Sequence, residues 1–142
     1  RYQTLQPEYN LFSREKYETH YEQLAVEQQL GVLTYYSLAS GFLTGKYKSD
    51  ADFNQSARSE GVKKQYWNER GQRIVAALEE VADAYKTTST AVALAWLIAR
   101  PSVAAPIVSA TKESHLEPFV SAVQLQLSPE SMEKLDAASD WK

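Results

Sequence analysis

The residues whose types and spacing could do chemistry gather first at positions 37–46, which read SLASGFLTGK. Small residues let backbone N–H groups approach a ligand closely, hydroxyl groups add hydrogen-bond donors, and Lys46 adds a positive charge. These are the components of a phosphate-binding loop. The same residues also suit a plain surface turn in which Gly41 and Gly45 adopt positive φ angles. The local sequence leaves both interpretations open.

A second candidate loop spans positions 109–112, which read SATK. It precedes an expected helix, and helix N-termini favour anions because their first N–H groups are unpaired and the helix dipole is positive there. An ordinary helix cap with a solvated lysine is the alternative. Both candidate loops follow expected parallel strands, and ligands bind at the carboxyl ends of such strands. This shared position favours a binding role for both loops.

Three further side chains could join such a site. Gln6 carries a long amide near the end of the first expected strand, although it would also suit a sheet edge as a plain polar residue. Tyr35 and Tyr36 end another strand, and side chains alternate between the two faces of a strand. We therefore expect one ring to face a ligand and the other to pack beneath a helix.

The sequence offers no catalytic set of its own. General acid–base chemistry needs titratable groups within hydrogen-bond reach of one another. No tyrosine, histidine, lysine and carboxylate fall together at the expected strand ends. His20 and His115 are too far apart in the sequence to suggest a metal site. We therefore predict neither catalytic residues nor a metal site within this chain.

The elements that position these residues begin with a βαβ unit. A short strand is expected at residues 2–6, a helix at 14–29 with Ser13 as its N-cap and Gly31 at its end, and a strand at 32–36. The second strand has no polar alternation, which is typical of a strand covered on both faces. Strand, helix and strand in close succession predict parallel pairing and an α/β fold.

The rest of the chain completes one α/β piece. A long polar connection is expected at residues 48–72, and loops of that length are usually functional or mobile. The remaining predicted elements are helices at 73–85 and 89–99, the second capped by Ser89, a buried strand at 104–108, and helices at 112–123 and 129–139, the last capped by Ser128. Three parallel strands with about five helices leave two sheet edges uncovered. We expect either that a partner chain supplies further strands or that this chain is a portion of a larger fold.

Composition limits the class of protein. The chain has 142 residues, of which 44% are hydrophobic, so residues 1–142 are expected to form a single α/β segment with a real core. Its net charge is -3 and its basic residues are scattered, which argues against nucleic acid as a partner. No apolar run approaches the roughly 20 residues that span a bilayer, and the N-terminus lacks the layout of a signal peptide. We therefore expect a cytoplasmic protein with no membrane partner.

Three segments of the sequence closely resemble the C-terminal half of bacterial aldo-keto reductases. They are LQPEYN at 5–10, GVLTYYSLASGFLTGKY at 31–47 and APIVSATKESHLEPF at 105–119, in the order and at the spacing of that family. The resemblance implies a (β/α)8 TIM-type barrel that reduces aldehydes and ketones with NADPH. It also implies that this chain supplies strands six to eight with their helices, which is an incomplete barrel on its own.

The resemblance implies a cofactor-binding role for residues in all three segments. It implies that Gln6 hydrogen-bonds the nicotinamide carboxamide, that Tyr35 stacks on the nicotinamide ring and that His115 approaches the adenine end. The pyrophosphate loop would contain Leu38, Ser40, Gly41 and Lys46. The loop around the adenosine ribose, where a lysine favours the 2′-phosphate of NADP, would contain Ser109, Ala110, Thr111 and Lys112.

Two departures from the family pattern limit these implications. Family members commonly carry Glu-Asn where this chain has Pro118-Phe119, and Phe119 lacks the amide that reaches adenine. The family's catalytic aspartate, tyrosine, lysine and histidine lie in the other half of the barrel. We therefore predict the cofactor contacts of an NADP(H)-dependent reductase of a small-molecule carbonyl substrate, without catalysis by this chain alone. The alternative is a non-catalytic half-barrel that self-associates through its strand edges or serves as a cofactor-binding, regulatory module.

Overall fold

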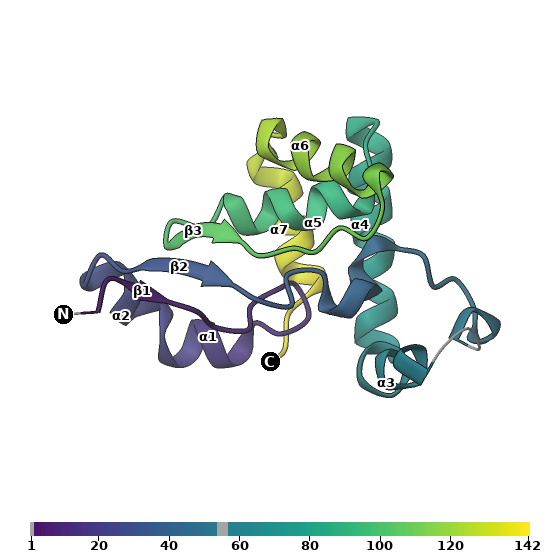
Figure 1. Ribbon diagram of the computed structural model, residues 1–142, viewed down its shortest axis with the longest axis horizontal. Helices are drawn as coiled ribbons and strands as arrows, with labels where there is room; N and C mark the ends of the chain where they lie inside the picture. Colours follow the sequence, from purple (N-terminus) through teal and green to yellow (C-terminus); the bar gives the residue numbers. More distant parts are fainter. Residues whose placement is uncertain (1, 54–56) are drawn as a thin grey trace.

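The computed structural model describes residues 2–53 and 57–142. Three strands form one parallel sheet, and β2 lies between the other two (Figure 1). They are β1 (Thr4–Leu5), β2 (Gly31–Thr34) and β3 (Val103–Pro106). The parallel pairing confirms the predicted α/β class, although each strand is shorter than the sequence pattern indicates.

The sheet is open at both edges. Thr4 pairs with Gly31 and Leu5 with Val32 across β1 and β2, and Val32 pairs with Val103 across β2 and β3. Within the described residues, no strand pairs with the outer edge of β1 or of β3. Unpaired edges present backbone N–H and C=O groups that a further strand can bind. The structure is therefore an open part of a TIM-type barrel, as predicted.

The strands are less covered than their apolar sequences indicate. Val32 and Thr34 are buried, but Gly31 and Leu33 are only half-buried, so β2 is not covered on both faces. In β3 the two central residues are exposed, which corrects the prediction of a buried strand there. β3 is an edge strand of this sheet, whereas β2 is its central strand.

The first helical connection consists of two short helices rather than the single helix predicted at 14–29. Helix α1 (Glu15–His20) and helix α2 (Glu22–Glu27) are separated at Tyr21, whose φ of -126° is not helical. Both helices lie along the β1 and β2 side of the sheet (Figure 1). The connection thus crosses from β1 to β2 as predicted, but its helical segment has a break at Tyr21 that the apolar pattern does not reveal.

The predicted caps of this connection are also wrong. The Ser13 hydroxyl donates to Glu8 Oε1 at 2.9 Å and makes no cap hydrogen bond with α1. Gly31 is the first residue of β2, whereas Gln29 has the positive φ, 52°, that ends the helical segment. The N–H of Leu30 bonds to the carbonyl of Ala25 at 2.8 Å, which closes this terminal turn. That bond compensates for the left-handed conformation of a residue other than glycine.

Residues 48–72 are largely helical, which corrects the prediction of a long polar loop; positions 54–56 lie outside the described residues. The segment holds the 3₁₀ helix η2 (Asp50–Phe53), helix α3 (Ala57–Tyr66) and the start of helix α4 (Glu69–Tyr85). Asn68 caps α4 by accepting a hydrogen bond from Gly71 N at 2.9 Å. Helix α4 therefore begins four residues before the predicted start at Arg73.

Aromatic packing explains why this polar segment is ordered. Phe53 stacks on Tyr47 with ring centroids 4.4 Å apart, and Tyr66 stacks on Phe42 at 5.6 Å. All four side chains are buried. Because these rings are distant in sequence, no local periodicity could indicate the contacts.

The remaining helices lie close to their predicted positions. They are α5 (Ser89–Ile98), the 3₁₀ helix η3 (Glu113–His115), α6 (Leu116–Gln124) and α7 (Pro129–Ala138). Thr88 caps α5 by accepting from Ala91 N, so the predicted cap, Ser89, is instead the first helical residue. Ser128 caps α7 as predicted. Across the described ranges, no helix combines the length and apolar character that crossing a membrane requires.

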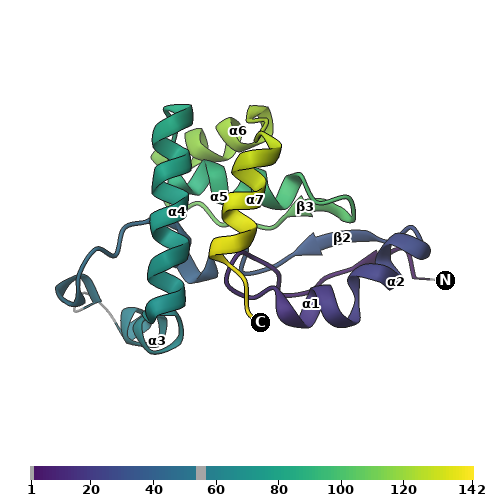
Figure 2. The same ribbon diagram turned by 180° about the vertical axis from the view of Figure 1, so that it is seen from behind.

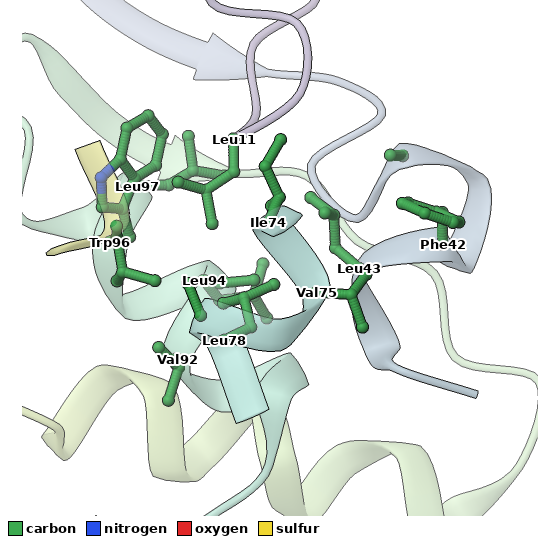
Figure 3. Close-up of a cluster of buried hydrophobic side chains, with 14 of the residues drawn as sticks. Leu11, Phe42, Leu43, Ile74, Val75, Leu78, Val92, Leu94, Trp96 and Leu97 are labelled. Atoms are coloured by element: carbon green, nitrogen blue, oxygen red, sulfur yellow. The ribbon is translucent and has the colours of Figure 1, made fainter. Parts of the chain in front are cut away.

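Helix α5 forms the centre of the hydrophobic core. Its residues 91–97 are all buried, and it contacts β3, α4 and α6. Figure 3 shows side chains of α4 and α5 gathered with Leu11, Phe42 and Leu43, which come from the connections that follow β1 and β2. These apolar residues anchor both connections in the core.

Arginine side chains hold the C-terminal end of α7, which lies beside α4 (Figure 2). Arg14 Nη1 donates to Ser139 Oγ at 2.7 Å, and Arg70 Nη2 donates to Ser139 O at 2.6 Å. Arg73 Nε donates to Ala138 O at 3.0 Å. The last carbonyl groups of a helix lack partners within the helix and carry partial negative charge. The arginines therefore satisfy this helix end and fix the C-terminal segment.

Candidate functional site

All three strands end at the same side of the molecule because they are parallel, and a connection carrying predicted site residues follows each one (Figure 1). We call residues 6–14, 35–46 and 107–115 the strand-end loops. Ligands of α/β proteins bind at this end of the sheet. The predicted residues are thus brought to one side of the molecule.

Ser37 joins the second and third strand-end loops. Its side chain is 2% exposed, and its Oγ lies 2.9 Å from Ile107 O and 3.1 Å from Thr34 O, to either of which it can donate. Ile107 N also donates to Thr34 O at 2.8 Å. One buried hydroxyl therefore links the segment that contains Tyr35 to the segment that leads to Lys112.

Asn10 joins the first and second strand-end loops. Its side chain is fully buried, and Nδ2 donates to Tyr36 O at 2.9 Å. Its Oδ1 accepts from the backbone N–H groups of Phe12 and Ser13, each at 2.8 Å. Together with Ser37, this amide ties the three loops into one unit.

The two tyrosines at the end of β2 do not point to opposite faces, which corrects the prediction from strand alternation. Their ring centroids are 5.3 Å apart with an edge-on geometry. Tyr36 has a φ of 50°, and this left-handed residue ends the strand before the alternation can apply. Tyr35 is 38% exposed and Tyr36 is 56% exposed, so neither ring packs beneath a helix. The pair forms an exposed aromatic surface at the strand ends.

The loop after these tyrosines contains the 3₁₀ helix η1 (Ala39–Thr44), which is bent by a run of left-handed residues. Ala39, Ser40 and Gly41 have φ values of 49°, 55° and 89°, and Gly45 follows with 74°. Positive φ is uncommon at residues other than glycine and carries a conformational cost. Such strained backbone clusters at ligand sites, which makes this loop the strongest structural candidate for binding.

The Lys46 side chain folds back over Gly41. Its Nζ lies 3.3 Å from the position that a Cβ atom on Gly41 would occupy, so a side chain at residue 41 would displace the ammonium group. Lys46 Nζ is also 4.9 Å from the centroid of the Tyr47 ring. Among the residues that the structure describes, no carboxylate forms an ion pair with Lys46. The cation is thus held beside the glycine-containing turn and open to an anion.

The third strand-end loop is exposed at all the positions predicted to contact the adenosine ribose. Residues 109–112 have no helical or strand structure, and Lys112 precedes η3 rather than starting an α-helix, which corrects the prediction of a helix from residue 112. Helix α6 begins only at Leu116. His115 Nδ1 accepts a hydrogen bond from Thr111 N at 3.4 Å, which folds the loop back on itself. This contact brings together two predicted cofactor residues.

Gln6 and Phe119 lie near the two ends of the predicted cofactor-binding segments. Gln6 directly follows β1 and is exposed. Phe119, which stands at the position that departs from the family pattern, is half-buried and packs against the hydrophobic core. The Phe119 ring therefore belongs to the core packing. The exposed polar groups near it come from the third strand-end loop.

Tyr66 is a buried titratable side chain that contacts the η1 loop through Ser40 and Phe42. Burial raises its pKa to about 12, the carboxylate of Glu8 adds to this shift, and a hydrogen bond with Ser40 opposes it. A phenol with a raised pKa stays protonated at neutral pH and supplies no base. Within the described ranges, no group of acidic and histidine side chains could hold a metal ion.

Asn10 and Ser37 are the residues that the sequence interpretation missed. Asparagine within a polar stretch after a strand is a common start of a side-chain turn, so its bonds to the two following N–H groups have a sequence signal. Its bond to Tyr36 has none, because the partners are 26 positions apart. Ser37 was one of the hydroxyls of the candidate phosphate loop, and the structure uses it instead as a buried connection.

The chain belongs to the aldo-keto reductase family. The family model described as "Aldo/keto reductase family" matches residues 1–140. A glycerol dehydrogenase from Gluconobacter oxydans has a similar structure, with 27% sequence identity and a TM-score of 0.80 over 95% of this chain and 41% of that one.

Curated relatives include proteins of two different descriptions. A protein named "Probable voltage-gated potassium channel subunit beta" from Arabidopsis thaliana is 34% identical over 92% of this chain and 42% of its own length. "Aldo-keto reductase yakc [NADP(+)]" from Schizosaccharomyces pombe is 30% identical over 96% of this chain and 41% of its own length. The chain therefore spans about two fifths of the length of the relatives it matches.

Proposed function

We propose that this chain is the cofactor-binding C-terminal part of an NADP(H)-dependent aldo-keto reductase that converts a small carbonyl compound to an alcohol. The observation that carries the proposal is the joining of the three strand-end loops by Asn10 and Ser37. That connection places an aromatic surface, a strained loop with a free cation and a hydroxyl-rich loop at one end of the sheet. A dinucleotide has a flat nicotinamide ring, a charged pyrophosphate and an adenosine end, and each of these would use one of the three features.

The residues present fit such a cofactor. Tyr35 supplies an exposed ring on which a flat nicotinamide can stack, with the Gln6 amide at the same end of the sheet for its carboxamide. The pyrophosphate would lie over the η1 loop, where small side chains let backbone groups approach and Lys46 is held over Gly41. The cofactor, when bound, supplies the hydride for the reduction. The chain's part is to orient the ring and to neutralise the phosphates.

The third strand-end loop would receive the adenosine end. The hydroxyl groups of Ser109 and Thr111 are exposed, and Lys112 supplies a charge that favours NADP over NAD through its 2′-phosphate. His115 holds the loop in its folded-back form through Thr111. A relative whose name specifies NADP(+) supports this choice of cofactor.

A second candidate function is a cofactor-binding or regulatory module without catalysis. Within the described residues both sheet edges are open, so their backbone groups are available for pairing. The relative named as a potassium channel subunit shows that similar sequences occur in proteins described by an assembly role. In this case the open edges would pair with a second copy of the chain.

Three measurements on the chain test these functions. Calorimetric titration with NADP⁺ and with NAD⁺ tests the cofactor site, and preferential binding of NADP⁺ is expected. Oxidation of NADPH in the presence of an aromatic aldehyde tests catalysis, and we expect a rate no higher than in buffer for this chain alone. Absence of binding to either dinucleotide would overturn both functions. Light scattering then decides between a monomer and a self-associated half-barrel.

A further inference from the structure

We propose that Asn10 is a positioning residue for the nicotinamide platform, which we define as the Tyr35 ring together with the Tyr36 backbone. The inference rests on the proposed function, because it assumes that a cofactor ring binds there. Asn10 would act through Tyr36 and touch no ligand. Its role is to hold the platform in the one conformation that presents both tyrosine rings together.

The burial and bonding of Asn10 set it apart from a surface polar residue. Its side chain has no solvent exposure, and both ends of its amide are engaged. A buried amide without hydrogen-bond partners would be strongly unfavourable, so these bonds fix the orientation of the Asn10 side chain. In that arrangement the nitrogen points to the carbonyl of Tyr36.

The bond to Tyr36 continues the β1–β2 pairing beyond the strands. Tyr35 N donates to Pro7 O at 2.9 Å, and Tyr9 N donates to Tyr35 O at 3.4 Å, as in a parallel ladder. At Tyr36 the backbone turns to a φ of 50°, and the ladder can no longer supply a donor. The Tyr36 carbonyl accepts instead from Ala39 N at 2.7 Å, within its own loop, and from the Asn10 side chain, which is the donor that connects it to the first strand-end loop. The amide thus compensates for the left-handed conformation that it contacts.

That conformation determines the shape of the platform. With φ negative at Tyr36, the strand would continue and the two rings would lie on opposite faces. With φ positive, the rings lie 5.3 Å apart on the same side. Loss of the Asn10 bond is therefore expected to release the tyrosine pair while leaving the third strand-end loop, which Ser37 holds, in place.

The test compares Asn10→Asp with a matched control, Asn68→Asp. Asn10→Asp is isosteric and keeps the oxygen that accepts from the two N–H groups, but it loses the donor and places a carboxylate against Tyr36 O. Asn68 uses only its oxygen in the cap of α4, and aspartate is an equally good cap, so that substitution should change nothing. Each variant is titrated calorimetrically with NADP⁺ and with adenosine 2′,5′-bisphosphate, which has the adenosine end but no nicotinamide.

We expect Asn10→Asp to weaken NADP⁺ binding about tenfold and to leave the bisphosphate affinity within about twofold. If Asn10→Asp weakens the binding of NADP⁺ and of the bisphosphate equally, or weakens neither, the inference is overturned while the proposed function stands. If the unchanged chain binds neither ligand, the proposed function fails and takes the inference with it.

Circular dichroism checks that each variant is folded. If Asn10→Asp unfolds the chain, Asn10→Ser, which keeps a shorter side-chain oxygen, is titrated in its place with the same expected selectivity. Unfolding of both variants would overturn the inference, because Asn10 would then serve the whole fold rather than the platform.

Discussion

Ser37 Oγ lies 2.9 Å from the carbonyl oxygen of Ile107, although the two residues are 70 positions apart in the chain. The hydroxyl is buried, and it also lies within hydrogen-bond distance of Thr34 at the end of β2. This contact connects the exposed tyrosine pair to the loop that carries Lys112. The Ser37 side chain therefore adds to the backbone bond between Ile107 N and Thr34 O in placing two proposed cofactor contacts relative to each other.

Ser37→Ala is expected to destabilise the chain and to weaken NADP⁺ binding. Removing the buried hydroxyl takes away its part-buried hydrogen bond to the Ile107 carbonyl, which typically costs about 1–2 kcal/mol of the free energy of unfolding. Urea unfolding followed by circular dichroism measures this loss. Ser114→Ala is the control, because Ser114 is exposed, and a change below about 0.5 kcal/mol is expected there. Equal effects at both sites would contradict a structural role for the Ser37 contact.

Lys46→Met is expected to weaken NADP⁺ binding without reducing stability. Lys46 is exposed and has no carboxylate partner in the described part of the chain, so its charge is free for a phosphate. Loss of a hydrogen bond to a charged group corresponds to about a tenfold loss of affinity or more. Lys16→Met, an equivalent change on the exposed surface of α1, should have little effect. The proposal fails at this point if both variants bind the cofactor equally well.

The difference in NADP⁺ affinity between the unchanged chain and the Lys46→Met variant should shrink as salt is added. Ions screen exposed charges at separations beyond about 8 Å at physiological ionic strength, and at higher salt this distance is shorter. Titrations at two salt concentrations therefore separate the charge of Lys46 from the loss of its side-chain packing.

Lys112→Gln tests the choice between NADP⁺ and NAD⁺. The two dinucleotides differ by the 2′-phosphate, and we expect the substitution to weaken NADP⁺ about tenfold while NAD⁺ affinity stays the same. The measurement is a pair of calorimetric titrations under identical conditions. Equal losses for both dinucleotides would show that Lys112 acts on the loop rather than on the phosphate.

The raised pKa of Tyr66 predicts that the chain loses stability at alkaline pH. Its folded-state pKa is raised by burial to about 12, from an ordinary value of 10.0. Between these values the folded chain keeps a proton that the unfolded chain releases, so stability is fully present below pH 10.0 and falls as pH rises to about 12. The loss is about 2–3 kcal/mol for two pKa units.

Tyr66→Phe should remove this part of the pH dependence, as measured by urea unfolding from pH 9 to pH 11, while Tyr2→Phe should leave it unchanged. Tyr2 is 90% exposed. Burial also raises the pKa values of Tyr9 and Tyr17, so part of the alkaline loss will remain in the Tyr66 variant. An unchanged alkaline loss in that variant would contradict the assignment to Tyr66.

Several features of the fold follow from local sequence alone. The run of apolar residues at 32–36 indicates a strand, and its sequence neighbours indicate a βαβ crossover, which the parallel pairing confirms. The Ser128-Pro129 pair indicates the start of α7, which the structure also confirms. These predictions succeed because strand propensity and helix capping are properties of a few adjacent residues.

The errors share a different cause. Helix α3 lies in a segment predicted as loop because its order comes from stacked rings such as Phe53 on Tyr47, and the alternation expected for Tyr35 and Tyr36 fails because Tyr36 is left-handed. The capping errors have local causes: the Ser13 hydroxyl donates to Glu8 instead of capping α1, and Thr88, next to Ser89, accepts the cap bond of α5. In each case the conformation or contact that decides the structure leaves no trace in the hydrophobic periodicity or in the capping preferences of the sequence.

The sequence by itself determined the α/β class, the positions of the strand-end loops and, through its resemblance, the family. Only the tertiary structure decided that Asn10 and Ser37 join those loops and that Lys46 folds over Gly41. The physical reason is that propensity and periodicity act over a few residues, whereas a buried hydrogen bond depends on where the whole chain places its two partners.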